Sequence, residues 1–337
     1  MTHEIKLLLH TAESWQQAEI RSVLATVVDL NGTSYRRPGV RMLINENGKT
    51  VGAVSGGCVE KEIQRQTQTV FKTGKAKMMT YDGRLRLGCE GILYILIEPL
   101  TLTLEFLETF NSYLDNRKTF KAITRYSKTP GENESMGTII EFKEKIFSLN
   151  DTKPEKAEKH LTFSQTFPPL FQLYIFGAEH DAVEVCKAAN NLGWKVTVVA
   201  GPDEAKTIDY FSGASQLITP TFDTIDTSSI DKETAIILMT HSFNKDVQYL
   251  MALKEVKPAY FGLLGSNQRR ERVLEKFLEY YPDISTEFIE QLHGPAGINI
   301  GAETPAEIAV SILAEILSVV RKQEPVALRE KTGSIHG

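Results

Sequence analysis

The fold of the second half of the chain is decided by the stretch LYIFGAEHDA, residues 173–182. Its first four residues form a short apolar run typical of a buried strand, and Gly177 supplies a turn. A helix is predicted from Asp181 to Leu192, with Cys186 packed on its apolar face. A strand, a glycine turn and a helix in this order are typical of the opening unit of a doubly wound parallel sheet.

Strands and helices continue to alternate along the second half. Strands are predicted at 195–199, 235–240 and 260–264, and helices at 246–253, 268–280 and 305–320. This order predicts a Rossmann-like domain with a doubly wound parallel sheet over residues 166–322, whose ligands lie at the carboxyl ends of its strands.

The turn at 177–182 only partly matches the dinucleotide-binding pattern G-x-G-x-x-G/A. Glu179 replaces the glycine that lets the backbone approach the pyrophosphate, so it adds bulk and negative charge there. The acidic residue expected about 20 positions later is also missing, although Asp203 lies close to that point. These departures argue against binding of ordinary NAD(P).

Other polar residues follow the carboxyl ends of the predicted strands. Each of His180 and His241 follows such an end, so we expect a role in a pocket rather than in the core. A turn at Gly265 and Ser266 opens a helix that carries three arginines, which predicts a site for an anion; a solvated basic helix face is the alternative. The candidate ligand-binding residues of this half are Gly177, His180, Asp181, His241, Gly265 and Ser266.

The first half is predicted to hold a separate mixed α/β domain over residues 1–100. Strands are expected at 22–28, 41–44, 50–54, 76–81 and 92–97, with helices at 15–21 and 61–73. Residues 101–165 are interpreted as a connecting segment with one helix and short strands, and residues 323–337 as a mobile tail.

The most reactive group is predicted within SGGCVE, residues 55–60. Cys58 follows Gly56 and Gly57 and precedes a helical run, so the helix end favours its thiolate and lowers its pKa. The two glycines allow positive φ angles and close approach of a ligand to the backbone. A Gly-Gly turn beside a small buried cysteine is the alternative interpretation.

Composition narrows the classes of function. The 337 residues are 42% hydrophobic, enough for two ordinary cores, and the net charge of −5 provides no global basic field for nucleic acid or an anionic membrane. No segment approaches the roughly 20 apolar residues of a membrane helix, and the N-terminus does not read as a leader, so a cytoplasmic location is expected. Three cysteines without a CxxC pair suggest neither disulfides nor zinc.

Several motifs occur together in a characteristic order. They are YRRPGVRM (35–42), SGGCVE (55–60), LGCEG (87–91), GAEHDA (177–182), TH (240–241), GLLGS (262–266) and GPAGINIGAETP (294–305). With them the chain resembles the XdhC/CoxI family from about Gly32 to Val320. Proteins of that family are accessory factors for xanthine dehydrogenase and aerobic carbon monoxide dehydrogenase.

The resemblance implies a chaperone for the molybdenum cofactor. Such a protein receives molybdopterin, holds it while the molybdenum acquires a sulfido ligand, and passes it to a xanthine dehydrogenase-type apo-enzyme. It also implies a sulfur donor of the cysteine desulfurase type and a homodimer. Arg36, Arg37 and Arg41 suit the cofactor phosphate, and Cys58 is the first choice for a contact to molybdenum or for handling sulfur, with Cys89 second.

The chain departs from the family pattern where Glu179 and Glu90 replace glycines. Two alternatives therefore stay open: an NAD(P)-dependent oxidoreductase with His180 or His241 as acid–base group, and a divergent scaffold without a ligand. Oxidation of purines by the chain itself is not expected, since it has no large molybdopterin domain, iron–sulfur cysteines or flavin site.

Overall fold

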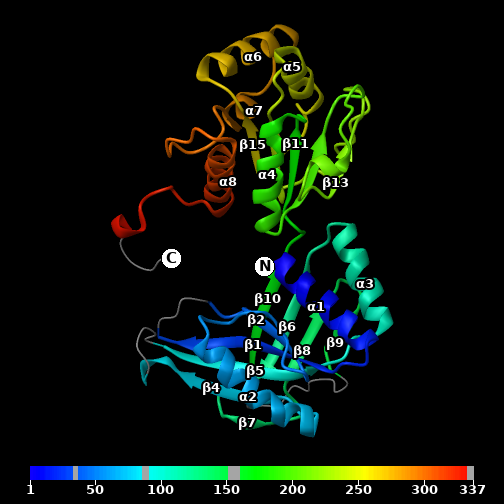
Figure 1. Ribbon diagram of the computed structural model, residues 1–337, viewed down its shortest axis with the longest axis vertical. Helices are drawn as coiled ribbons and strands as arrows, with labels where there is room; N and C mark the ends of the chain where they lie inside the picture. Colours follow the sequence, from blue (N-terminus) through cyan, green and yellow to red (C-terminus); the bar gives the residue numbers. More distant parts are fainter. Residues whose placement is uncertain (33–36, 86–90, 151–159, 332–337) are drawn as a thin grey trace. The chain divides into compact units, whose positions relative to one another are not determined.

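The computed structural model describes residues 1–32, 37–85, 91–150 and 160–331. It divides into two compact units, Met1–Pro169 and Leu170–Gly337 (Figure 1). The sequence pattern predicts the first domain boundary near residue 100, whereas the structure extends the first unit to Pro169.

The first sheet of the first unit is antiparallel throughout, in the order β3-β2-β1-β5-β4-β7. Its strands are β1 (Ser22–Asn31), β2 (Arg41–Asn45), β3 (Thr50–Gly52), β4 (Lys77–Asp82), β5 (Ile92–Leu100) and β7 (Gly131–Glu132). Helix α2 (Cys58–Thr73) covers one face with Val59, Ile63 and Val70. These positions are four and seven residues apart and therefore form one apolar stripe along the helix.

The first helix differs from the prediction of a helix at 15–21. Helix α1 spans Thr2–Gln17, and it buries Ile5, Leu8, Leu9 and Ala12. The spacing of these four residues places them on one face of a helix. The prediction from the sequence did not use this helical pattern, which lies before residue 15.

The described residues between 101 and 169 supply the second sheet of the first unit, helix α3 (Leu104–Asp115) and the edge strand β7 of the first sheet, which differs from the interpretation as a connecting segment. The sheet is antiparallel in the order β10-β6-β8-β9, from β6 (Phe120–Tyr126), β8 (Gly137–Glu141), β9 (Ile146–Ser148) and β10 (Leu161–Phe167). Helix α3 packs on it, and the ring centroids of Phe110 and Phe120 lie 5.5 Å apart. Polar stretches between the short strands obscure this aromatic core in the sequence.

A buried carboxylate connects the two sheets. Glu98 on β5 accepts hydrogen bonds from the backbone N–H and the hydroxyl of Thr138 on β8, at 2.8 and 2.5 Å. Burial raises the pKa of Glu98 to about 7, although the bonds from Thr138 and the charge of Arg41 oppose this change. The interior between the sheets therefore holds a carboxyl group that titrates near neutral pH.

The second unit contains a six-stranded parallel sheet in the order β13-β12-β11-β14-β15-β16. Its strands are β11 (Gln172–Phe176), β12 (Lys195–Val199), β13 (Gln216–Ile218), β14 (Thr234–Leu238), β15 (Tyr260–Leu263) and β16 (Leu292–His293). Numbered from β11, this is the strand order 3-2-1-4-5-6 of dinucleotide-binding folds, which confirms the predicted Rossmann-like domain.

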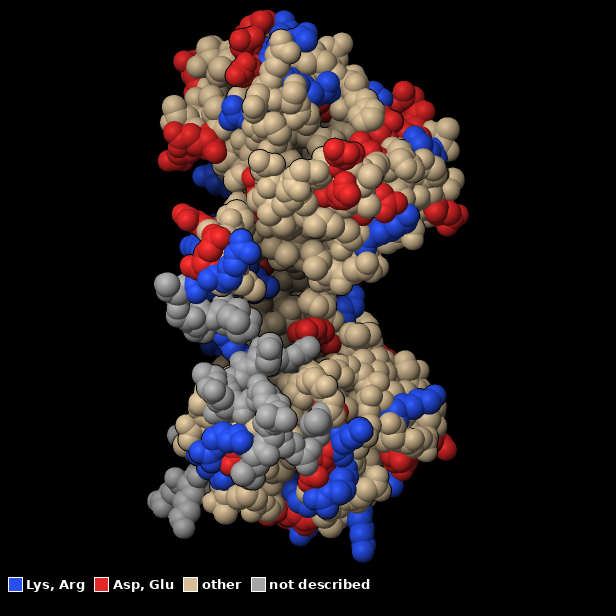
Figure 2. Space-filling view, turned by 60° about the vertical axis from the view of Figure 1, so that its left-hand side comes forward, with Lys and Arg blue, Asp and Glu red and all other residues tan. Residues whose placement is uncertain are grey.

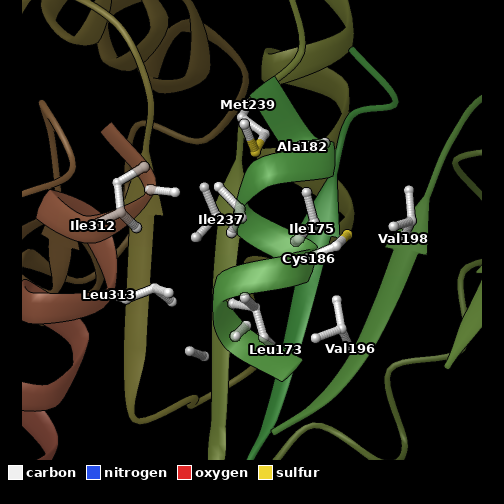
Figure 3. Close-up of a cluster of buried hydrophobic side chains, with 14 of the residues drawn as sticks. Leu173, Ile175, Ala182, Cys186, Val196, Val198, Ile237, Met239, Ile312 and Leu313 are labelled. Carbon is white, nitrogen blue, oxygen red and sulfur yellow. The ribbon is translucent and has the colours of Figure 1, made fainter. Parts of the chain in front are cut away.

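Helices cover both faces of this sheet (Figure 1). Helices α4 (His180–Asn191) and α8 (Pro305–Arg321) share one hydrophobic core, while α5 (Phe243–Ala252), α6 (Asn267–Tyr280) and α7 (Thr286–Glu290) share the other. Figure 3 shows Cys186 of α4 among Ile175 and Val198 in the first core. Cys186 is fully buried, which confirms its packing role.

Charges are mixed on the face shown in Figure 2, where lysine and arginine side chains alternate with acidic ones. Within the described ranges, no helix combines the length and apolarity that a membrane crossing needs. Residues 323–331 follow α8 and contain one short 3-10 turn, Leu328–Glu330; their expected mobility stays a prediction.

The titration of Glu98 has a measurable consequence for stability. The pKa of Glu98 is about 7 in the folded protein and 4.5 ordinarily. The stability that the protonated carboxyl group contributes is therefore fully present below about pH 4.5 and is lost as pH rises through 7. We expect the stability of wild type relative to Glu98→Gln to fall by about 3 kcal/mol between pH 4.5 and pH 8.

Urea unfolding tests this difference, with the fluorescence of Trp15 recorded in a Trp194→Phe background so that the signal comes from the first unit. Glu132→Gln, which removes an exposed carboxylate from the same sheet, is the control. A difference between wild type and Glu98→Gln that stays constant across this pH range would contradict the assignment.

Candidate functional site

The turn between β3 and α2 is held by one carboxylate. Glu60 Oε1 accepts from the backbone N–H groups of Val54 and Ser55, at 3.1 and 2.5 Å. Its Oε2 accepts from the Ser55 hydroxyl at 2.9 Å and from Gly57 N–H at 2.8 Å. Burial tends to raise the pKa of Glu60, but these hydrogen bonds outweigh burial and lower it. Glu60 is therefore an ionised anchor at neutral pH.

The backbone of this turn is exposed at Gly56 and Gly57 in the described part of the chain. Gly57 has a φ of 123°, which favours glycine, and no described atom beyond its chain neighbours would lie within 4 Å of a side chain at Gly56 or Gly57. Helix α2 begins at Cys58, as the sequence predicts to within three residues. The thiol of Cys58 lies outside the described side chains, and Arg36 and Cys89 lie outside the described residues. The roles of these three residues stay predictions.

Arg41 does not join the Cys58 turn. Side chains alternate between the two faces of a strand, so Met42 and Ile44 face α2 while Arg41 points to the opposite face, between the sheets. Arg41 is only 7% exposed, whereas Arg37 is exposed just before β2. Arg41 therefore does not share the exposed surface on which Arg37 lies, because the strand that starts at Arg41 turns its side chain inward.

In the second unit, the ends of β11 and β14 meet at the point where the strand order reverses. Gly177 has a φ of 137°, and a Cβ atom there would lie 2.8 Å from the carbonyl oxygen of Met239. The close approach brings Asp181 and His241 together, with 3.7 Å between Asp181 Oδ2 and His241 Nε2. The His241 side chain is 64% exposed and His180 is also exposed. Both histidines therefore lie outside the core, and their role in a ligand pocket stays a prediction.

Glu179 occupies the N-cap position of α4. Its backbone is extended, with φ −78° and ψ 170°, and its side chain makes no capping hydrogen bond to the helix. In dinucleotide-binding folds this helix start faces the pyrophosphate. The carboxylate thus stands next to the position that phosphate groups would need.

The turn at Gly265 and Ser266 differs from the predicted anion site. Ser266 caps α6 by accepting from Arg269 N–H at 3.2 Å, and a Cβ at Gly265 would lie 2.5 Å from Arg269 Cδ. The Arg269 guanidinium is engaged elsewhere, with Nη2 at 2.5 Å from Asp246 Oδ2 and 3.1 Å from the Thr240 carbonyl. Arg269 therefore covers the turn instead of offering its charge to a phosphate.

Asp246, the partner of Arg269, was not predicted from the sequence. Asp246 is fully buried on α5, and its Oδ1 lies 2.5 Å from the Thr240 hydroxyl. Burial raises the pKa of Asp246, while the hydrogen bonds from Thr240 and Arg269 oppose this change. An acidic residue in the first turn of a helix is usually a solvated one, so no signal in the sequence distinguishes it. Glu60 was detectable, since a glutamate three residues after a helix cap is the capping-box pattern.

Among the described residues, no group of three or more histidine, cysteine, aspartate or glutamate side chains could hold a metal ion. The two candidate regions are thus the glycine turn before α2 in the first unit and the switch point of the parallel sheet in the second. The chain thus belongs to the class of two-unit α/β proteins. Its first unit is antiparallel and carries an exposed glycine turn before a helix, and its second unit is of the Rossmann type.

Comparison with known families identifies the same two parts. The model of the XdhC and CoxI family matches residues 15–82, and the model of the XdhC Rossmann domain matches residues 173–316. The chain belongs to the XdhC and CoxI family, which confirms the resemblance read from its motifs.

Relatives of this family match along nearly the whole chain. A Bacillus subtilis protein named as a probable subunit of xanthine dehydrogenase is 28% identical over 89% of this chain and 94% of its own length. The molybdenum cofactor insertion chaperone PaoD of Escherichia coli is 26% identical over 96% of this chain and 91% of its own length. A crystal structure described as a xanthine dehydrogenase from Bacillus halodurans superposes with a TM-score of 0.76 at 26% identity, covering 94% of this chain and 96% of that one.

The three cysteines are expected to differ in reactivity. Burial raises the pKa of Cys186 to about 12, so its thiolate is scarce at neutral pH and out of reach of a reagent. We expect iodoacetamide to label Cys58 first, Cys89 second and Cys186 last, as read by peptide mass spectrometry. The same protein in urea is the control, in which all three should react alike. Labelling of Cys186 as fast as Cys58 in the folded protein would contradict this order.

Removal of Arg269 should destabilise the second unit. Arg269→Met leaves the buried Asp246 carboxylate without its ionic partner, which costs about 3–5 kcal/mol. Arg272→Met on the same helix is the control, because the exposed Arg272 only lies over the Phe243 ring at 5.4 Å and such a contact is worth about 0.5–1 kcal/mol. Urea unfolding followed by Trp194 fluorescence in a Trp15→Phe background measures both. Equal losses for the two variants would refute the network.

Proposed function

We propose that this protein is an accessory factor that binds the molybdenum cofactor and delivers it to a xanthine dehydrogenase-type molybdenum enzyme. The observation that carries the proposal is the similarity to PaoD, a molybdenum cofactor insertion chaperone, which extends over 96% of this chain and includes both domains. The naming of another relative as part of a xanthine dehydrogenase supports a partner of that type.

The turn before α2 supplies the chemistry for the cargo. Molybdopterin carries a phosphate and a dithiolene-bound metal, and helix starts with free N–H groups attract anions. The exposed backbone of Gly56 and Gly57 lets a flat ligand come close, while Glu60 fixes the shape of the turn. Cys58 begins the helix directly after it, and a thiolate there is a soft ligand of the kind that suits molybdenum or transferred sulfur.

The protein holds the cofactor while the molybdenum acquires a sulfido ligand with the help of a cysteine desulfurase-type sulfur donor, and it acts as a cytoplasmic homodimer. Holding the cofactor on a turn instead of in a deep pocket suits this task, because the cargo must leave again.

An NAD(P)-dependent oxidoreductase is the second candidate, favoured by the strand order of the second unit and by the Asp181–His241 pair at its switch point. Glu179 opposes it, since a carboxylate at the start of α4 repels a pyrophosphate. Calorimetry with NAD separates the two candidates: micromolar binding by wild type would favour the oxidoreductase.

The cofactor hypothesis is tested by purifying the protein from cells that make molybdopterin. Molybdenum content and the fluorescence of the oxidised pterin measure the bound cargo. We expect Cys58→Ala to lower both by at least about tenfold, because loss of a group that supports a metal costs 10–100-fold in affinity.

Cys186→Ala is the matched control, since it removes a thiol that packs in the core of the second unit. Circular dichroism verifies that both variants are folded. Full retention of molybdenum and pterin by Cys58→Ala would reject the role of Cys58, and absence of both from wild type would reject the proposed function.

A further inference from the structure

Helix α8 of the second unit has an apolar outer face. Its inner face packs in the first core, into which Ile312 and Leu313 point in Figure 3. An outer stripe, with spacings of four, four and three residues, consists of Ala306, Val310, Ala314 and Leu317. These spacings place the four side chains on one face of the helix. None of them is buried, and Val310 is 56% exposed.

The polar side chains within α8 are all bonded to the protein itself. Between residues 308 and 320 they are Ser311, Glu315 and Ser318. Ser311 donates to the Ile298 carbonyl at 2.6 Å, and Ser318 donates to the Glu315 carbonyl of its own helix at 2.8 Å. Glu315 Oε2 accepts from the Tyr260 hydroxyl at 2.5 Å and from Gly297 N–H at 2.7 Å. The outer stripe therefore offers water no polar group.

Other helices of this unit carry charges where they face water. Glu184 and Lys187 form an ion pair at 2.8 Å on α4, and Lys276 and Glu279 form one at 2.5 Å on α6. A helix at the surface of a globular protein usually has such a polar face, whereas a helix that is apolar on all sides is usually buried. The outer stripe is thus typical of a surface that another molecule covers.

The two ends of α8 carry opposite charges. Glu303 and Glu307 lie at its start, Arg321 and Lys322 lie at its end, and all four are exposed. An antiparallel copy of the helix places the acidic start of each copy against the basic end of the other. A parallel copy would bring like charges together, which costs free energy. The charges of α8 are therefore complementary to those of a second α8 that runs in the opposite direction.

The outer stripe is also symmetric about its centre. With a two-fold axis between residues 313 and 314, Val310 of one copy lies opposite Leu317 of the other. Ala306 then lies opposite Arg321, whose aliphatic stem covers it. Ala314 lies next to the axis, where a small side chain lets two helices approach closely. The same surface thus serves both copies, as a two-fold interface requires.

We propose that α8 pairs in the antiparallel direction with α8 of a second copy of this chain, through the outer stripe. The inference deepens the proposed function, on which the expectation of a homodimer rests, by naming the surface that joins the two copies. The apolar stripe forms the centre of the contact, and the charged helix ends form its rim and set its direction.

Introduced cysteines test the pairing and its direction, in a Cys58→Ala, Cys89→Ala background without cofactor. Mild oxidation should link two copies of Ala314→Cys, since a disulfide forms where Cα atoms lie about 4.4–6.8 Å apart. Arg321→Cys is the control on the same helix. In an antiparallel pair its two copies lie about 22 Å apart along the helix axis, at about 1.5 Å per residue, so it should stay unlinked.

Sedimentation velocity of the full chain over a range of concentrations measures the dimer itself. Val310→Glu places a carboxylate without a partner in the outer stripe and should raise the dissociation constant at least about tenfold. Ile208→Glu is the matched control, because Ile208 is a 38% exposed aliphatic residue of the same unit outside α8. It should sediment as wild type does.

A wild type that stays monomeric would overturn the proposal; this result is expected if an acceptor enzyme or another part of the same chain covers α8. A dimer that Val310→Glu leaves unchanged would also overturn it. Equal linking of Ala314→Cys and Arg321→Cys would refute the antiparallel direction. These outcomes are distinct from failure of the proposed function, because the association is measured without cofactor.

Discussion

The candidate cofactor turn depends on one carboxylate that collects four hydrogen bonds. Glu60 holds Val54, Ser55 and Gly57 from the first turn of α2, so the glycine pair has a fixed path although its own atoms touch little else. Glu60 thus fixes the shape of the turn, while the backbone of Gly56 and Gly57 stays exposed for a ligand. An exposed turn lets a bound molecule leave again, which suits the delivery of cargo that we propose for this protein.

In the second unit, a different constraint acts where the strand order reverses, between β11 and β14. Gly177 lets the end of β11 pass within contact distance of the Met239 carbonyl, and this fixes where Asp181 and His241 meet. The neighbouring turn is filled by Arg269, whose charge is neutralised by the buried Asp246. The fold thus keeps the frame of a dinucleotide-binding domain while an acidic residue at the start of α4 and an occupied arginine reduce its attraction for phosphate.

Sequence patterns predicted the second unit well because its buried strands are continuous apolar runs and its helices have clear periodicity. They missed β13 and β16, which are three and two residues long and carry too few side chains for any period. The second sheet of the first unit was also missed, because polar stretches separate its short strands and its edge strand β10 pairs with the distant β6. Arg41 shows a further limit: its place on a strand was predicted, but which face it uses depends on packing against α1 and β10.

The most direct test of the central claim is the transfer of cofactor to an acceptor. The protein is purified with its molybdenum cofactor and mixed with a cofactor-free xanthine dehydrogenase-type enzyme, and purine oxidation is followed against the amount of cofactor supplied. We expect activity to appear in proportion to the loaded protein and faster than with the same amount of free cofactor. Activation no faster than with free cofactor, from a protein that carries the cargo, would contradict a role in delivery.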